Sequence, residues 1–131
     1  MTKRNSEIVR QLYGAFNEAD WASATALADP DLVWVPDPRV GVGPIEGADD
    51  ALRFFRDRAE MFDEFRIEVE RLEEAGNKVV AMLRTSGRGE ASGAEFEIRV
   101  DHVWTLRDGV VIRGEGYGDR DEALKAAGLN P

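Results

Sequence analysis

The single histidine is the residue of this chain best suited to acid/base chemistry. His102 lies in the middle of residues 95–109, where apolar and polar side chains alternate. An imidazole has an unperturbed pKa near neutrality, so a well-placed histidine can donate or accept a proton in catalysis. A lone histidine on an apolar face can equally be a core residue with one hydrogen bond. The sequence leaves both interpretations open.

Asp101, the neighbour of His102, is the second candidate catalytic residue. The alternation places His102 on the apolar, inward side of the strand and Asp101 on the outward side. A slip of one residue would exchange the two sides, so the pattern does not by itself decide which of them faces a site. We side with the alternation and expect His102 to line an internal cavity with Trp34 and Trp104.

Composition excludes several classes of function. A net charge of −9 argues against nucleic acid or an anionic membrane as a partner. With one histidine and no cysteine, a zinc site made only of imidazoles or thiolates cannot form within one chain. The chain has no apolar run long enough to span a bilayer and no leader-like segment. We therefore predict no metal or other cofactor and a cytoplasmic protein.

Three helices and a short strand are predicted before residue 64. The first helix is capped by Asn5 or Ser6 and runs to about Glu18, and the second is capped by Asp20 and runs through residue 27. Residues 32–35 form a short strand, and a loop rich in proline and glycine follows it. The third helix spans residues 47–63. The first and third helices each present an apolar face.

The second half of the chain predicts an antiparallel meander. Strands are expected at residues 65–74, 79–85, 95–109 and 110–117, with a mobile loop at residues 86–93. A last helix begins at an Asp119 cap and ends at Gly128. Helices segregated on one face of an antiparallel sheet define a single α+β domain, residues 1–131. A bent sheet around a long helix leaves a conical cavity that suits a ligand.

Several stretches resemble the SnoaL-like branch of the nuclear-transport-factor-2-like superfamily. They are residues 12–20, 31–34, 43–47, 102–109 and 119–129. The resemblance implies a cone-shaped, curved antiparallel sheet wrapped around N-terminal helices, which is the nuclear-transport-factor-2-like or cystatin-like fold. That fold hosts isomerases, cyclases, hydrolases and plain binding modules, so it does not define a function.

The catalytic positions of ketosteroid isomerase are only partly matched. Asp101 resembles its oxyanion aspartate, whereas Leu12 stands at its tyrosine position with Tyr13 beside it. Pro36 stands at its base position with Asp37 beside it. One of the expected groups is therefore present and two are displaced by one residue.

Two other chemistries of the superfamily also lack essential groups. The comparison with limonene epoxide hydrolase puts Arg84 on its arginine but Ser86 and Gly116 on its two aspartates. The resemblance to the SnoaL-type cyclases implies that Gly116 also stands at the position of their acid/base aspartate. No known activity of the fold is carried over intact.

A binding pocket for a small apolar ligand remains the prediction. The candidate ligand contacts are Tyr13, Trp34, Phe55, Arg84, Val100 and Trp104. Gly114, Gly116 and Gly118 are expected to face inward opposite His102, Val100 and Ile98, where missing side chains leave space. One hypothesis is an acid/base isomerase, cyclase or hydrolase on a polyketide-, terpene- or steroid-like substrate. The alternative is a non-catalytic ligand-binding or dimerisation module.

The outward face of the sheet predicts an assembly. Arg99, Asp101, Arg113, Glu115 and Tyr117 should share this face, with arginine–carboxylate pairs between neighbouring strands. The resemblance implies that this face builds a two-fold dimer. We therefore expect a homodimer through the sheet.

Overall fold

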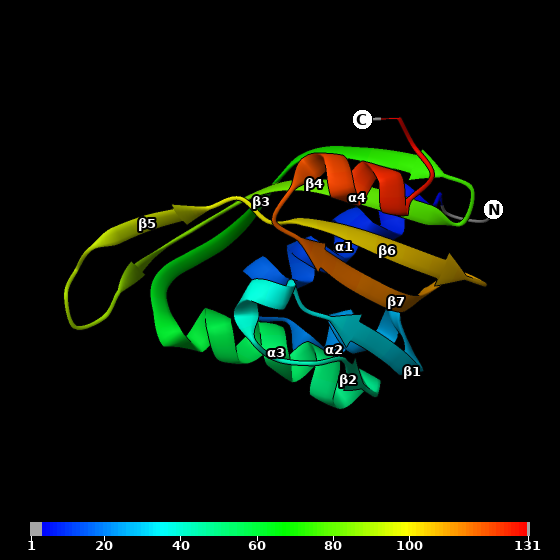
Figure 1. Cartoon of the computed structure of the whole chain (residues 1–131). Helices are drawn as coiled ribbons and strands as arrows, with labels where there is room; N and C mark the ends of the chain where they lie inside the picture. Colours follow the sequence, from blue (N-terminus) through cyan, green and yellow to red (C-terminus); the bar gives the residue numbers. More distant parts are fainter. Residues whose placement is uncertain (1–3, 131) are drawn as a thin grey trace.

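A curved sheet with helices on both faces forms the fold (Figure 1). The computed structural model describes residues 4–130. The inner face packs against α1 (Asn5–Asn17), α2 (Trp21–Ala26) and α3 (Ala48–Met61). The outer face packs against α4 (Arg120–Ala126). The predicted α+β class with N-terminal helices inside a curved sheet is confirmed.

The strands follow the order β2-β1-β7-β6-β4-β3, with β5 pairing β4 beyond the end of β6. Their bounds are β1 Ala28–Val35, β2 Ile45–Glu46, β3 Phe62–Ala75, β4 Lys78–Gly89, β5 Glu95–Ile98, β6 Asp101–Arg107 and β7 Val110–Tyr117. The strands from β3 to β7 pair antiparallel, as the meander predicts. The sequence did not predict β2 or the parallel pairing of β1 with β7.

The predicted caps are present at α2 and α4, whereas the predicted cap of α1 by Asn5 or Ser6 is wrong, because α1 follows Arg4 and has no side-chain cap. The Asp20 carboxylate accepts from the Ser23 backbone N–H at the start of α2, and Asp119 does the same for the first turn of α4. At the end of α4, Gly128 adopts a φ of +80° and Leu129 N–H donates to the Leu124 carbonyl. That is a Schellman ending.

The long strand predicted at residues 95–109 is interrupted between β5 and β6. The register against β4 is the same on both sides of the break, because Ile98 pairs with Thr85 and His102 with Ala81. Within the break, Leu83 N–H donates to the Asp101 carboxylate at 3.2 Å. A side chain thus takes a donor that the backbone ladder would use, and the inward–outward alternation continues unchanged.

Other predicted boundaries were wrong for local reasons. β4 continues to Gly89 where a loop was expected, and it forms a hairpin with β5 that projects from the sheet (Figure 1). Gly87 lies under the Phe96 ring, where a Cβ atom would come within 2.8 Å of ring carbons. This glycine therefore permits close packing in a strand. β1 begins at Ala28, ahead of the predicted start, and α3 ends at Met61.

The inward glycines of β7 are shifted by two residues from the predicted register. Gly114 lies opposite Trp104, and Gly116 lies opposite His102. A Cβ atom at Gly114 would come within 2.7 Å of both Trp34 and Trp104 ring carbons. The two indole rings therefore fill the space that a side chain at residue 114 would need.

Candidate functional site

A cavity of about 440 Å³ lies between the inner face of the sheet and α3. Its walls are mostly apolar, and their aromatic side chains are Trp34, Phe54, Phe55, Phe62, Phe65 and Phe96. Val40, Met61 and Ile98 also line it and are 41%, 58% and 49% exposed, so the cavity reaches the surface through an apolar rim. Besides Trp34, four side chains of the wall carry hydrogen-bonding groups: Asp37, Arg58, Thr85 and His102.

His102 is held by a chain of hydrogen bonds from behind the cavity wall. Trp104 Nε1–H donates to the Tyr13 hydroxyl oxygen at 2.8 Å, and that hydroxyl lies 2.6 Å from His102 Nδ1. All three side chains are buried, and α1 supplies the tyrosine while β6 supplies the other two. The three residues connect the first helix to the central strand.

The tautomer of His102 follows from this chain. The Tyr13 hydroxyl already accepts from Trp104, and no other acceptor for its proton occurs in the described part of the chain. A buried hydroxyl donates its proton when an acceptor is within reach. Tyr13 therefore donates to His102 Nδ1, which leaves the imidazole proton on Nε2.

We infer that the Nε2–H of His102 faces the cavity. Within residues 4–130 this nitrogen has no hydrogen-bond partner. Unlike Trp34 Nε1, it is not fully enclosed. His102 itself lines the cavity. His102 therefore adds a neutral ring N–H donor to a mostly apolar wall.

Burial sets the charge of both rings. It lowers the pKa of His102 to about 3, although the Asp101 carboxylate acts in the opposite direction. Burial also raises the pKa of Tyr13 well above its ordinary value, although the hydrogen bond from Trp104 opposes this shift. At neutral pH the pair is an uncharged phenol and an uncharged imidazole. His102 is then a hydrogen-bond donor and a weak base.

Trp34 and Phe55 form the aromatic surroundings of His102. The His102 ring lies edge-to-face with Trp34 at 4.8 Å and with Phe55 at 5.8 Å between centroids. Trp34 in turn stacks on Trp104 at 5.4 Å. The Trp34 Nε1 atom is buried and has no hydrogen-bond partner within residues 4–130. Such a donor is costly unless a ligand or water completes it.

Asp37 is the one carboxylate of the described cavity wall, and its oxygens are already bonded. One oxygen accepts from the backbone N–H and the Nε of Arg39, and the other accepts from Gly118 N–H. Burial alone would raise the pKa of Asp37, but these bonds hold it below its ordinary value. Asp37 joins the end of β1 to the end of β7 as a bonded anion.

The predicted site residues fall into three groups: those that line the cavity, those behind its wall, and those on the outer face of the sheet. Trp34, Phe55, Val100 and His102 line the cavity. Tyr13 and Trp104 stand behind them and act on His102 through the hydrogen bonds described above. The sequence did not point to Arg58 or to the Phe54 ring beneath it as parts of the wall. Their spacing of four residues on an apolar helix face was the available signal.

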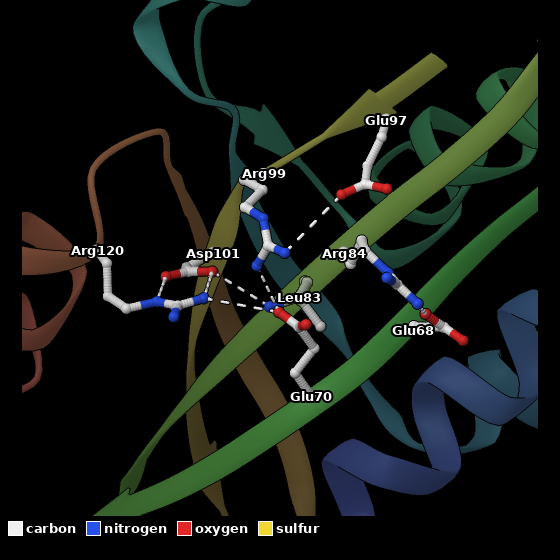
Figure 2. A network of polar contacts seen from close by, with 8 residues as sticks. All are labelled: Glu68, Glu70, Leu83, Arg84, Glu97, Arg99, Asp101 and Arg120. Carbon is white, nitrogen blue, oxygen red and sulfur yellow. Dashed lines mark hydrogen bonds and ion pairs between the residues drawn. The ribbon is translucent and has the colours of Figure 1, made fainter. Parts of the chain in front are cut away.

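Asp101 and Arg84 lie on the outer face, away from the cavity (Figure 2). The Asp101 carboxylate is 4% exposed and accepts from Arg120 Nε at 2.8 Å, in addition to Leu83 N–H. Arg84 forms an ion pair with Glu68 on the neighbouring strand. Arg84 was predicted to contact the ligand but does not line this cavity, and the partner of Asp101 comes from α4 and not from a neighbouring strand.

Comparison with known structures defines the class as the ketosteroid-isomerase-like or NTF2-like α+β fold. IdmH, a proposed polyketide cyclase from Streptomyces antibioticus, aligns with a TM-score of 0.80 and 19% identity over 95% of this chain and 98% of that one. An NTF2-like protein from Burkholderia thailandensis gives 0.77 and 28% over 98% and 99%. A protein of this fold from Catenulispora acidiphila, in complex with trimethylamine, gives 0.76 and 16% over 98% and 95%.

The family is narrower than the fold. Residues 9–114 match the model of the SnoaL-like domain, and the chain belongs to that family. Among curated proteins, no sequence matches the chain significantly. No helix in residues 4–130 is long and apolar enough to cross a membrane.

Proposed function

We propose that the cavity binds a small, mainly apolar molecule through a carbonyl or similar oxygen that accepts from His102 Nε2–H. The hydrogen-bond chain from Trp104 through Tyr13 to His102 carries this proposal, because it fixes which imidazole nitrogen bears the proton. A single oriented donor in an apolar pocket gives a ligand both affinity and orientation. Trp34 Nε1–H also lacks a partner within residues 4–130, but it is fully enclosed, so the proposal does not depend on it.

The apolar walls favour polyketide-, terpene- or steroid-like ligands. The volume of about 440 Å³ lies within the range of pockets that hold molecules of that size. Two related structures support a small-molecule site: the Catenulispora protein was crystallised with trimethylamine, and IdmH is a proposed polyketide cyclase. These relatives support a small-molecule site and leave the ligand class and the reaction open.

If the chain is an enzyme, His102 acts as an electrophile. A neutral imidazole N–H can stabilise negative charge that develops on a carbonyl oxygen, for instance in an enolate formed during isomerisation or cyclisation. Its depressed pKa disfavours the role of proton carrier at neutral pH. Asp37 is a poor base for the same reason, because its oxygens are bonded to Arg39 and Gly118. Binding is therefore the function that the geometry supports best.

Paired ligands with and without an oxygen acceptor test this proposal. Benzophenone and diphenylmethane share two rings and differ at the carbonyl group. The parent protein should bind benzophenone about tenfold more tightly, as one oriented hydrogen bond in an apolar site allows. His102→Phe keeps an aromatic ring without a donor and should abolish this preference. Quenching of tryptophan fluorescence can report binding, because Trp34 lines the cavity.

Ile98→Ala is the matched control. Ile98 lines the same cavity but lies at its half-exposed rim and carries no donor. This substitution should weaken both ligands equally and keep their ratio. Binding of neither ligand to the parent, or an equal ratio in parent and His102→Phe, would contradict the proposal.

A further inference from the structure

Arg58 is a cation in the wall of an otherwise apolar cavity. It lies in the last turn of α3, and its guanidinium carbon is 3.6 Å from the centroid of the Phe54 ring. Phe54 precedes it by one helical turn, so side chains at these two positions share a face. Phe54 also lines the cavity, and stacking on its ring places the guanidinium against the cavity wall.

No carboxylate within residues 4–130 forms an ion pair with Arg58. The other arginines of α3 are paired, Arg53 with Asp50 and Arg56 with Glu60. Asp37, the one carboxylate of the described wall, is bonded to Arg39 and Gly118. Asp57 acts on Arg58 only through its charge. In a chain of net charge −9, a half-buried arginine without a salt bridge is unusual.

The surroundings of Arg58 favour an anionic partner. Burial lowers the pKa of Arg58 from its ordinary value, and the Asp57 charge offsets this only in part. A partly desolvated guanidinium gains more from an anion than one in open water, and it binds carboxylates through two parallel N–H donors. Met61, its neighbour on the cavity rim, is apolar and exposed, so an incoming molecule would meet apolar surface beside a positive charge.

We infer that the natural ligand is an amphipathic carboxylate, whose acid group binds Arg58 while its apolar body fills the cavity. This inference rests on the proposed binding function and specifies the ligand class: an apolar ring or chain with a ketone for His102 and a carboxylate for Arg58. Keto acids with condensed or linked rings have this composition. The overall negative charge of the protein does not favour anions, so selection for the carboxylate depends on this one side chain.

The test compares 4-benzoylbenzoate with its methyl ester at pH 7.5, where the acid is ionised. Both carry the benzophenone ketone and differ in the charge of the acid group. The parent should bind the acid about tenfold more tightly than the ester, as a charge-assisted bond predicts. Arg58→Gln should remove that preference, because it should weaken binding of the acid far more than binding of the ester. Arg58→Met, which keeps an apolar stem over Phe54, should behave in the same way.

Arg56→Gln is the control, because it removes the same charge from the same helix at a residue that does not line the cavity. It should keep the preference for the acid. Equal affinity of acid and ester for the parent, or equal effects of Arg58→Gln and Arg56→Gln, would overturn the inference. Ester binding that persists in that case leaves the proposed function intact. Failure of benzophenone and both derivatives to bind would contradict the proposed function itself.

Discussion

At His102, hydrogen bonding and burial act together on one imidazole. The Tyr13 hydroxyl determines which nitrogen carries the proton, and the apolar surroundings keep the ring neutral. These two effects convert a residue that is normally a proton carrier into a fixed donor. The same two effects make measurable predictions about stability and binding.

The first prediction is that His102 makes folding stability depend on pH. Its pKa is about 3 in the folded state and near 6.5 when unfolded, so the unfolded chain binds the extra proton between these values. Stability from this group is complete above pH 6.5 and falls as the pH drops towards 3. The slope is about 1.4 kcal/mol per pH unit.

Denaturant unfolding at pH 7 and pH 5 can measure this effect. Carboxylates contribute a slope of the same sign, so the parent must be compared with His102→Asn. The parent should lose about 2 kcal/mol more than the variant between these two pH values. Equal losses would show that His102 titrates alike in the folded and unfolded states.

The second prediction concerns Tyr13. Tyr13→Phe removes the donor to His102 Nδ1 and the acceptor for Trp104 Nε1–H, both buried. It should cost about 1–3 kcal/mol of stability, since two buried polar groups lose their partner. It should also reduce the preference for benzophenone over diphenylmethane, because the proton is then free to move to Nδ1. A variant that keeps the full preference would show that Tyr13 does not set the tautomer.

Two consecutive residues of β6 have different roles: Asp101 is a structural charge, and His102 is a candidate functional group. His102 lines the cavity and Asp101 binds Arg120 of α4, so consecutive residues lie on opposite sides of the sheet. The third prediction follows: Asp101→Ala should destabilise the fold by about 1–3 kcal/mol, because Leu83 N–H and Arg120 both lose their acceptor. Ligand binding by folded protein should stay unchanged.

Glu68→Ala provides the comparison for Asp101→Ala. It also removes one carboxylate from an arginine on the outer face (Figure 2). Both partners of this pair are substantially exposed. Its cost should be at most about 1 kcal/mol. Loss of binding in folded Asp101→Ala would assign Asp101 a role in the site after all.

Glycines in different elements give the fourth prediction. Gly114→Ala, in β7, would push a methyl group against Trp34 and Trp104, and it should cost about 1–3 kcal/mol or more. Gly14→Ala, in α1, meets nothing within 4 Å and should add up to about 1 kcal/mol through helix propensity. Melting curves of the two variants should shift in opposite directions. A shift in the same direction would refute this account of Gly114.

The sequence predicted the elements well because their signals are local. Apolar spacing located α1 and α3, capping aspartates located α2 and α4, and alternation placed His102 on the inner face of β6. Pairings between distant segments had no local signal. The parallel contact of β1 with β7 and the ion pair of Asp101 with Arg120 depend on the tertiary arrangement of segments that are far apart in the sequence. Gly87 was misread, since glycine spacing alone cannot distinguish a flexible loop from a strand under an aromatic ring.

The site was predictable only in its outline. Strand alternation assigned His102 to the inner face, Trp34, Phe55 and Val100 were candidate ligand contacts, and all four line the cavity. The chain of hydrogen bonds through Tyr13 joins α1 to β6 over a separation of 89 residues, which no pattern in the sequence indicates. Arg58 was missed for a similar reason, because its lack of an ion pair is visible only when its neighbours are positioned.

The fifth prediction concerns assembly. Apart from the part covered by α4, the outer face of the sheet carries charged pairs such as Arg84–Glu68 and Arg99–Glu70. We predict a homodimer through this face that buries at least about 1,000 Å² in total. Light scattering at tens of micromolar should return twice the chain mass, whereas a monomer mass would exclude this assembly.

The protonation of His102 in the whole folded protein is the central claim. Because the chain has one histidine, tag-free protein labelled with ¹⁵N-histidine gives the resonances of a single imidazole. The account predicts a protonated Nε2 and an unprotonated Nδ1 at pH 7.5, with neither resonance moving down to pH 5. A proton on Nδ1, or joint titration of both nitrogens with a midpoint near 6.5, would contradict it.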